Sequence, residues 1–175
     1  MTGPPAIPDY LALDDDALLA QCEVTNARGS GPGGQHRNKN ETGVRIRHLP
    51  TGCIGQAFER RHRAQNFANA VSRLRREIAL NVRRPVDFER FEVPPALAAI
   101  LPGAPSRLGP NNDRYWAGVQ CLLDLFAALD GSVADASAAL GLSTGALSRV
   151  LVRDDAVMAA ANRIRGERGL APLRR

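Results

Sequence analysis

Apolar residues recur at helical spacing in two separate stretches of the chain. In the first stretch, four of them lie at i, i+4, i+7 and i+11 and predict a helix over residues 63–82. These four are Phe67, Val71, Leu74 and Ile78. Arg73 and Arg76 lie on the opposite face, so we expect one side of this helix to pack on a core and the other to face solvent.

Short β-like segments precede this helix. Acidic residues predict a helix over residues 14–21, because negative charge is favourable at a helix N-terminus, and residues 22–26 follow as a strand. Residues 44–48 and 54–58 are two further strand-like segments. The sequence Leu-Pro-Thr-Gly joins them, which is typical of a turn, so they predict a hairpin.

The second half of the chain is predicted to be helical throughout. Its first helix is closed by Asp-Gly at 130–131 and is defined by Tyr115, Val119, Leu122, Phe126 and Leu129. Ser132 suits the N-cap of a short helix, Gly141 turns the chain, and two more helices follow from Ser143 onwards. Between the two halves, residues 91–112 lose periodicity and hold five of the twelve prolines.

These patterns predict an α+β fold. We expect a small domain with a short, mostly antiparallel sheet and a packed helix, followed by an all-α C-terminal module. The predicted boundaries are residues 1–90 for the first domain, 91–112 for a Pro-rich linker and 113–175 for the helical module.

Positive charge is concentrated in one region of the chain. Residues 28–90 hold 13 arginines and Lys39 against five acidic residues, a net charge of +9, whereas the whole chain carries +5. Clustering of this kind is typical of a surface that binds nucleic acid, because phosphates neutralised by cations release condensed counterions. A basic face that is merely solvated is the alternative interpretation.

Composition excludes several other classes of protein. Apolar residues make up 44% of the chain and charged residues 23%, as in a globular protein, and no apolar run approaches the roughly 20 residues of a membrane span. The start lacks the features of a secretory signal, so we expect a cytoplasmic protein with no membrane partner. Three widely spaced cysteines predict neither a disulfide framework nor a zinc site, and we expect them to be small core residues: Cys22, Cys53 and Cys121. No metal or cofactor is expected.

Residues 29–38 form a glycine-rich loop with the sequence Gly-Ser-Gly-Pro-Gly-Gly-Gln-His-Arg-Asn. Its glycines match the spacing GxGxxG, but neither a helix pattern nor an acidic ribose partner follows, so a dinucleotide site is not predicted. A phosphate-binding Walker loop would need Gly-Lys-Ser/Thr. An ordinary surface loop explains the glycines but not the basic, amide-rich residues after them. Glycines let backbone amides approach a ligand closely and point at a developing oxyanion.

Three segments together resemble the peptidyl-tRNA hydrolase domain of class I peptide chain release factors. They are the loop from Arg28 to Lys39, the sequence Val-Arg-Ile-Arg-His-Leu-Pro-Thr-Gly at 44–52, and the Arg- and Asn-rich stretch at 61–78. The likeness covers residues 18–80, with the segments in the family's order and at its spacing.

The resemblance implies a catalytic role for Gly33, Gly34 and Gln35. In this family the loop enters the peptidyl-transferase centre of the ribosome and promotes attack of water on the ester of peptidyl-tRNA. The backbone amide of Gln35 would stabilise the transition state and its side chain would exclude larger nucleophiles. That glutamine is often N-methylated in the family, so a methyltransferase is an expected partner. Large-subunit ribosomal RNA and the tRNA would supply most of the remaining catalysis.

Basic and polar residues around the loop are expected to contact RNA. They are Arg28, Ser30, His36, Arg37, Asn38, Lys39, Arg45, Arg61, Arg63, Asn66, Arg73 and Arg76.

Two departures from full-length release factors shape the expected function. Only 27 residues precede Arg28, so we expect no codon-reading domain and predict a monomeric, codon-independent rescue factor for stalled ribosomes. Short relatives often end in a basic tail, whereas residues 91–175 hold nine arginines against eight acidic residues. We therefore expect the helical module to select the target.

The helical module contains its own motif. Residues 132–151 resemble a helix-turn-helix, with Gly141 in the turn and a possible recognition helix that carries Ser143, Thr144, Ser148 and Arg149. Simple packing of a helical bundle is an equal alternative. A second function therefore stays open: a catalytically silent factor that binds ribosomal or transfer RNA in quality control, or a regulator that binds DNA.

Overall fold

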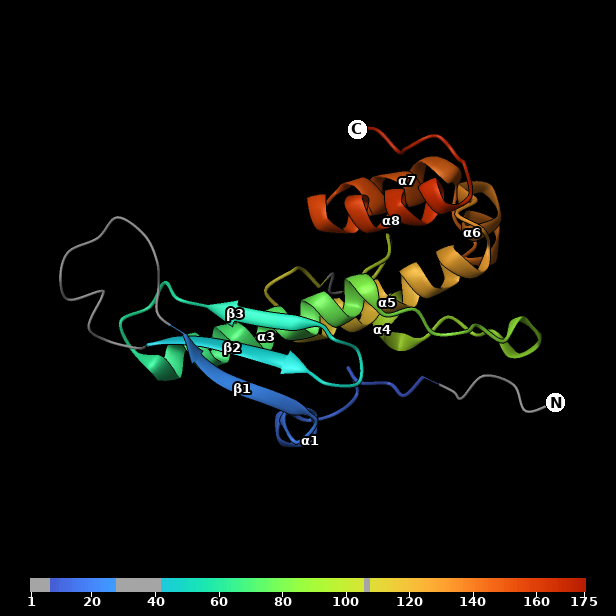
Figure 1. The fold of residues 1–175 in the computed structure, drawn as a ribbon. Coiled ribbons are helices and arrows are strands. Elements are labelled where there is room, and N and C mark those ends of the chain that lie inside the picture. Colours follow the sequence, from blue (N-terminus) through green and yellow to red (C-terminus); the bar gives the residue numbers. More distant parts are fainter. Residues whose placement is uncertain (1–6, 28–41, 106–107) are drawn as a thin grey trace. The chain divides into compact units, whose positions relative to one another are not determined.

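The computed structural model describes residues 7–27, 42–105 and 108–175 of the 175-residue chain. Within these residues lie one three-stranded antiparallel sheet and seven α-helices (Figure 1). The predicted α+β fold class is confirmed. The chain divides into two compact units, Asp9–Ile78 and Ala79–Arg175 with Ile7 and Pro8, and each is described by itself. The three-part division at residues 90 and 112 stays a prediction.

The first unit is built around the sheet, whose strands lie in the order β1-β2-β3. The strands are β1 (Cys22–Ala27), β2 (Gly43–His48) and β3 (Ile54–Ala57). Val24 of β1 lies opposite Ile46 of β2, which in turn lies opposite Gly55 of β3. The turn between β2 and β3 contains Gly52 at φ +71°, a conformation that favours glycine, so the predicted hairpin is confirmed.

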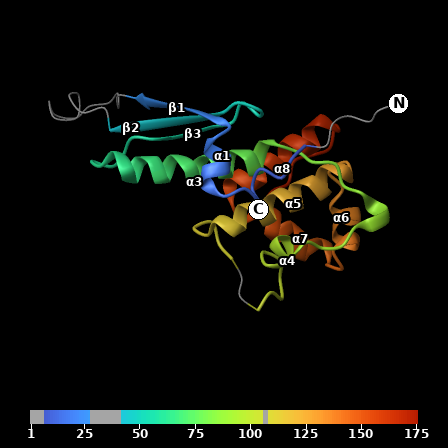
Figure 2. The same ribbon diagram turned by 90° about the horizontal axis from the view of Figure 1, so that it is seen from below.

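Helix α3 (Arg63–Asn81) covers one face of the sheet (Figure 2). Alternation in β2 points Val44 and Ile46 towards this helix, where they are fully buried together with Leu74 and Ile78. The other face of β2 presents Arg45 and other exposed side chains. One sheet face therefore builds the core, and the opposite face of β2 carries exposed side chains in the part of the chain that the structure describes.

Gly55 allows β3 to approach α3 closely. A Cβ atom at this position would lie 2.0 Å from the carbonyl oxygen of Ala70 and 2.5 Å from the backbone nitrogen of Leu74. Both obstacles are backbone atoms of a helix, so neither can move aside as a side chain could. The absence of a side chain at Gly55 sets the spacing between sheet and helix.

Helix α1 (Asp15–Leu19) is held against α3 by a buried arginine. Asp14 caps α1 by accepting a hydrogen bond from the Ala17 amide at 2.8 Å. Arg75 donates through Nη2 to Asp15 at 2.7 Å and to the Leu13 carbonyl at 2.9 Å, and only 8% of Arg75 is exposed. This arginine therefore belongs to the structure of the unit, unlike its exposed neighbour Arg76.

The second unit is helical among its described residues. After a short 3-10 helix η1 (Phe88–Arg90), its helices are α4 (Pro95–Ala98), α5 (Asp113–Ala128), α6 (Val133–Ala139), α7 (Thr144–Val152) and α8 (Asp155–Glu167). Ser132 caps α6, Ser143 caps α7 and Asp154 caps α8. Gly131 and Gly141 have φ of +72° and +63°, so glycines end the helices where the sequence predicts.

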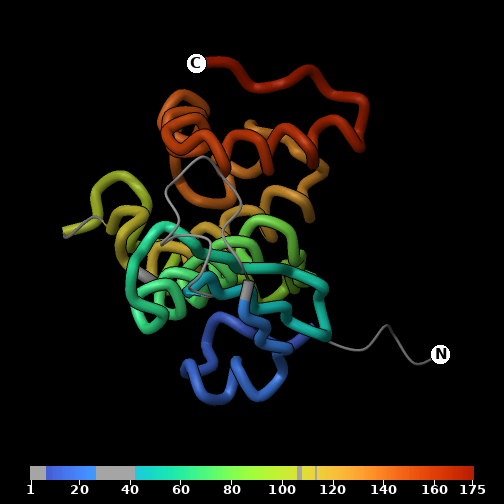
Figure 3. Tube along the Cα trace, turned by 60° about the vertical axis from the view of Figure 1, so that its left-hand side comes forward, coloured from blue at the N-terminus to red at the C-terminus, as the bar shows by residue number. Residues whose placement is uncertain are grey.

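Large apolar residues of α5, α7 and α8 form the core of the second unit. Leu122, Phe126, Leu147, Leu151 and Ala161 are all fully buried. The chain after α8 turns back along this helix (red in Figure 3), where the Leu173 amide donates to the Asn162 side chain at 2.6 Å. The C-terminal residues are thereby tied to the helical unit.

A buried carboxylate organises the chain just after α3. Asp124 of α5 accepts hydrogen bonds from the Arg84 amide and from Arg84 Nε, both at 3.0 Å, and lies 3.4 Å from Arg83 Nη1. Burial raises the pKa of Asp124 and lowers the pKa of Arg83. For both groups the loss of hydration outweighs the attraction of the partner.

The Pro-rich segment contributes to the helical core. Within residues 91–112, α4 packs on α5, and Leu97 of α4 is buried together with Ile100 and Leu101 just after it. Gly118 permits this contact, since a Cβ there would lie 2.3 Å from the Ala96 carbonyl oxygen. The segment is thus more ordered than its lost periodicity indicates, because a four-residue helix is too short to show a period.

Two further expectations concern single residues and spans. The prediction that the three cysteines are core residues is wrong, because each is only half-buried. The sulfur of Cys121, for example, accepts a hydrogen bond of 3.5 Å from Arg84 Nη2. None of the described helices has the length and apolar character of a membrane span.

Candidate functional site

The predicted catalytic residues Gly33, Gly34 and Gln35 lie outside the described residues. The same holds for part of the predicted RNA-contacting set, namely Arg28, Ser30, His36, Arg37, Asn38 and Lys39. The structure does describe the residues on either side of the segment 28–41, where β1 ends and β2 begins. Ala27 ends β1 and pairs with Gly43, the first residue of β2, so both ends lie on neighbouring strands.

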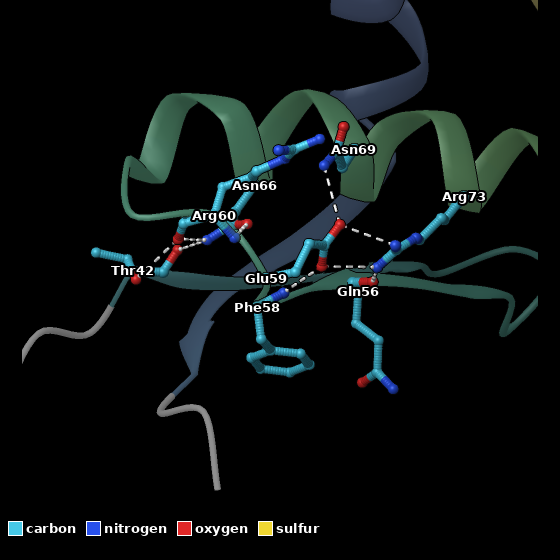
Figure 4. Close-up of polar contacts among 8 residues, drawn as sticks. All are labelled: Thr42, Gln56, Phe58, Glu59, Arg60, Asn66, Asn69 and Arg73. Carbon is cyan, nitrogen blue, oxygen red and sulfur yellow. Dashed lines mark hydrogen bonds and ion pairs between the residues drawn. The ribbon is translucent and has the colours of Figure 1, made fainter. Parts of the chain in front are cut away.

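Asn66 of α3 binds the chain at the return end of this segment (Figure 4). Its Nδ2 donates to the carbonyl oxygens of Thr42 at 2.7 Å and of Arg60 at 2.9 Å, and its Oδ1 accepts from the Arg60 amide at 2.9 Å. The side chain is fully buried. Asn66 therefore differs from the expected RNA contact, since its amide is used inside the protein.

Arg63 reaches the other end of the segment. Its Nε donates to Oδ1 of Asn26, the penultimate residue of β1, at 3.0 Å. Arg63 is exposed, so the same guanidinium can also face a phosphate. Arg61 is exposed as well and lies in the connection between β3 and α3.

Glu59 forms a second polar centre in this connection (Figure 4). Its carboxylate accepts hydrogen bonds from Arg73, from Asn69 Nδ2 at 3.0 Å and from the Phe58 amide at 3.0 Å. Arg73 also donates to the carbonyl oxygen of Gln56 at 2.7 Å. The guanidinium of Arg73 is thus fixed in position while about half of its side chain stays exposed.

Three of the predicted RNA-contacting arginines converge on one hollow of the first unit. Arg45 from β2, together with Arg73 and Arg76 from α3, lines a groove of about 640 Å³. The remaining lining residues are Ile54, Gln56 and Glu77. We call this hollow the basic groove. Its cations outnumber its single carboxylate, so it suits the phosphates of a nucleic-acid backbone.

The two other histidines differ in environment. His48 is fully buried, its Nδ1 lies 2.8 Å from Thr51 Oγ1, and its ring packs edge-on against Tyr10. Burial lowers the pKa of His48, which favours the neutral ring. His62 is exposed just before α3. His48 is therefore structural.

Among the described residues, the polar side chains near the segment 28–41 make hydrogen bonds within the protein, and the cations of the basic groove are predicted to contact phosphates. No three His, Cys, Asp or Glu side chains among the described residues gather as a metal site requires. The sequence analysis missed four polar residues, namely Asn26, Thr42, Glu59 and Asn69. Asn26 and Thr42 lie at the two ends of the segment 28–41, whereas Asn69 binds Glu59 in the β3–α3 connection. A signal for them exists in the helical spacing of Arg63, Asn66, Asn69 and Arg73, which places four hydrogen-bonding side chains near one face.

In the helical unit, α6 and α7 pack together around the turn at Gly141. The Ser143 hydroxyl accepts a hydrogen bond from the Ala146 amide at 3.2 Å, which is an N-cap contact. Thr144 and Arg149 are exposed and Ser148 is half-buried. Contact of these residues with nucleic acid stays a prediction.

Comparison with known proteins finds relatives for part of the chain. Residues 18–90 match the family model described as RF-1 domain. The chain is 38% identical to peptide chain release factor 1 of Paracoccus denitrificans over 84 residues, which are 48% of this chain and 24% of that protein. It is 41% identical to peptide chain release factor 1 of Acidiphilium cryptum over 69 residues, 39% of this chain and 20% of that protein.

These matches are partial on both sides. A third relative, peptide chain release factor 1 of Geobacter sulfurreducens, is 36% identical over 72 residues, 41% of this chain and 20% of its own length. The chain thus spans about a quarter or less of the curated relatives it matches. No solved structure matches the chain.

Proposed function

We propose that this chain, whose residues 18–90 match the RF-1 domain model, is a member of the class I peptide chain release factor family and hydrolyses the ester between peptide and tRNA on the ribosome. Gly33 and Gly34 would let the backbone enter the crowded peptidyl-transferase centre, since neither carries a side chain. The backbone amide of Gln35 would then donate to the oxyanion that forms as water attacks. The Gln35 side chain would exclude nucleophiles larger than water.

The observation that carries this proposal is the pairing of a Gly-Gly-Gln sequence with the basic groove in one unit. Arg45, Arg73 and Arg76 come from two different elements and line a single hollow. Ribosomal RNA and tRNA are the partners that such a surface fits, because both present closely spaced phosphates. With RNA supplying the surroundings of the ester, the protein would need no general base of its own.

We further propose that release does not depend on a codon. Residues 91–175, which make up most of the second unit and would select the ribosomal state, carry nearly balanced charge, with nine arginines against eight acidic residues. A surface of that kind adds little general attraction to RNA and acts through a few specific contacts.

The test is peptide release from purified ribosome complexes that carry labelled peptidyl-tRNA. The complexes differ in the decoding site: a stop codon, a sense codon, a truncated mRNA, and an isolated large subunit. We expect release from several of them regardless of codon, and loss of release with Gly34→Ala while ribosome binding is retained. Release only at a stop codon would contradict codon independence. Binding without any release would favour the catalytically silent RNA-binding factor.

A further inference from the structure

The N-terminal half of α3 carries a row of four polar side chains that we call the polar row: Arg63, Asn66, Asn69 and Arg73. Steps of three and four residues keep these side chains near one face of a helix. Each binds a residue outside α3, and two of these contacts lie at the ends of the segment 28–41.

The contact at Thr42 is the stronger of the two. Asn66 is fully buried and makes three hydrogen bonds of 2.7 to 2.9 Å, one of them to Thr42 and two to the backbone of Arg60. The threonine hydroxyl adds a longer contact of 3.5 Å to the Arg60 carbonyl oxygen. Thr42 and the β3–α3 connection are thus joined through one side chain (Figure 4).

A buried asparagine is a costly choice for a core position unless its hydrogen bonds specify something. An apolar side chain at position 66 would fill the space, whereas an unsatisfied amide or carbonyl costs about 1–3 kcal/mol. The β1–β2 ladder already pairs Ala27 with Gly43 through the backbone. The contacts from Asn66 to Thr42 and from Arg63 to Asn26 therefore fix the two ends of the segment in addition to the backbone pairing of the sheet.

We infer that Asn66, assisted by Arg63, is a positioning residue for the catalytic segment of this protein. Asn66 fixes Thr42 after the segment, and Arg63 fixes Asn26 before it. Both hold these points from the first turn and a half of one helix. The inference rests on the proposed function, because the effect of positioning is measured as a change in the rate of peptidyl-tRNA hydrolysis. Misplacement of reacting groups by about 1 Å lowers rates by about a hundredfold, so a small shift at either end has a large effect on the rate.

The first test is Asn66→Asp, which keeps the size of the side chain and the acceptor for the Arg60 amide. It replaces the Nδ2 donor by an oxygen that faces two carbonyl oxygens, at Thr42 and Arg60. We expect the single-turnover release rate at saturating protein to fall about tenfold, with little change in the half-saturating concentration. The matched control is Asn69→Ala, one turn away on α3, whose partner Glu59 lies at neither end of the segment. This variant keeps the wild-type rate.

A second pair of variants covers the case in which Asn66→Asp does not fold. Asn26→Ala removes the partner of Arg63 but leaves its charge, so it lowers the release rate without weakening ribosome binding if Arg63 positions the strand end. Arg63→Ala lowers both. The inference is overturned if Asn26→Ala releases peptide at the wild-type rate and Asn66→Asp, where it folds, does so too. A loss confined to binding overturns it as well.

Hydrogen–deuterium exchange separates this inference from the proposed function. If wild-type protein releases no peptide, the proposed function fails, and the exchange of amides in residues 28–44 decides the structural part. Faster exchange there in Asn66→Asp or Asn26→Ala than in Asn69→Ala supports anchoring of the segment ends. Equal exchange in all variants overturns it.

Discussion

Arg73 binds Glu59 through both of its terminal nitrogens, with Nη2 at 2.8 Å from Oε1 and Nη1 at 3.2 Å from Oε2. This fork aligns two parallel hydrogen bonds between α3 and the β3–α3 connection. Burial by itself would raise the pKa of the Glu59 carboxyl. The amides of Glu59 and Phe58 and the Arg73 guanidinium act in the opposite direction and lower this pKa to about 2.

The lowered pKa of Glu59 predicts a specific pH dependence of stability. Its folded-state pKa lies below the ordinary value of 4.5, so its contribution is fully present above that pH and is lost as pH falls towards 2. We expect wild-type protein to have a higher Tm than Glu59→Gln at pH 6, and the difference to shrink between pH 4.5 and 2. The effect is modest because 43% of the Glu59 side chain is exposed.

The measurement is thermal unfolding of both proteins from pH 6 down to pH 2. Glu23→Gln, at an exposed carboxylate of β1, is the control and should not reproduce this pH-dependent difference. A Glu59→Gln curve parallel to wild type throughout this range contradicts the assignment.

Close packing at Gly55 predicts a large cost for one methyl group. Gly55→Ala would place a Cβ against two backbone atoms of α3, which forces the sheet and the helix apart. We expect the free energy of unfolding to fall by about 3 kcal/mol, the upper range for overpacking. Urea denaturation with a shared m-value measures it.

Gly52→Ala is the matched control for this substitution. Gly52 has φ +71° and nothing within 4 Å of an added Cβ, so only backbone strain of about 1 kcal/mol is expected there. If Gly55→Ala and Gly52→Ala lowered the free energy of unfolding equally, crowding against α3 would not explain the need for glycine at position 55.

Local sequence signals were sufficient to predict α3, the hairpin and helices α5 to α8, but not the four-residue helix α4. Their signals are local: a stripe in α3, a turn glycine at Gly52, and caps at Ser132 and Ser143. Contacts between residues far apart in sequence left no such signal. Arg75 and Arg76 are adjacent and chemically identical, and only the position of Asp15 relative to α3 shows that one is buried.

The candidate site divides in the same way. Clustered charge in residues 28–90 predicted a surface that binds nucleic acid, and three of the predicted arginines line the basic groove, but their contact with RNA stays a prediction. Asn66 was predicted to contact RNA because it is polar and close in sequence to basic residues. Its burial follows from three backbone partners, at Thr42 and Arg60, that no sequence pattern identifies.

Arg75 and Arg76 also provide a matched test of RNA binding. Arg76→Gln removes a cation from the basic groove, so we expect weaker binding to ribosomes and a salt slope reduced by about one unit. Arg75→Gln removes the same charge from the contacts to Asp15 and Leu13. It should lower the Tm and leave the salt slope unchanged.

Binding titrations at several salt concentrations distinguish the two arginines. Equal salt slopes for wild type and Arg76→Gln would mean that this arginine does not contact a phosphate. A reduced salt slope in Arg75→Gln would mean that Arg75 also influences RNA binding at the basic groove, and not only the stability of the fold.

The exposed face of α7 predicts an effect on target choice without an effect on chemistry. Thr144 and Arg149 are exposed on this helix, whereas its apolar side packs into the second unit. We expect Arg149→Ala to change the ratio of release rates between ribosome complexes by about tenfold. The release rate on the preferred complex should stay within about twofold of the wild-type rate. The reason is that a few specific contacts carry recognition when the net charge is small. Ser143→Ala is the control for folding, since loss of its N-cap lowers stability by about 1 kcal/mol without removing an exposed cation. A ratio that is unchanged in Arg149→Ala, in a protein of wild-type Tm, would assign target choice to the RF-1 domain and leave α7 a purely structural helix.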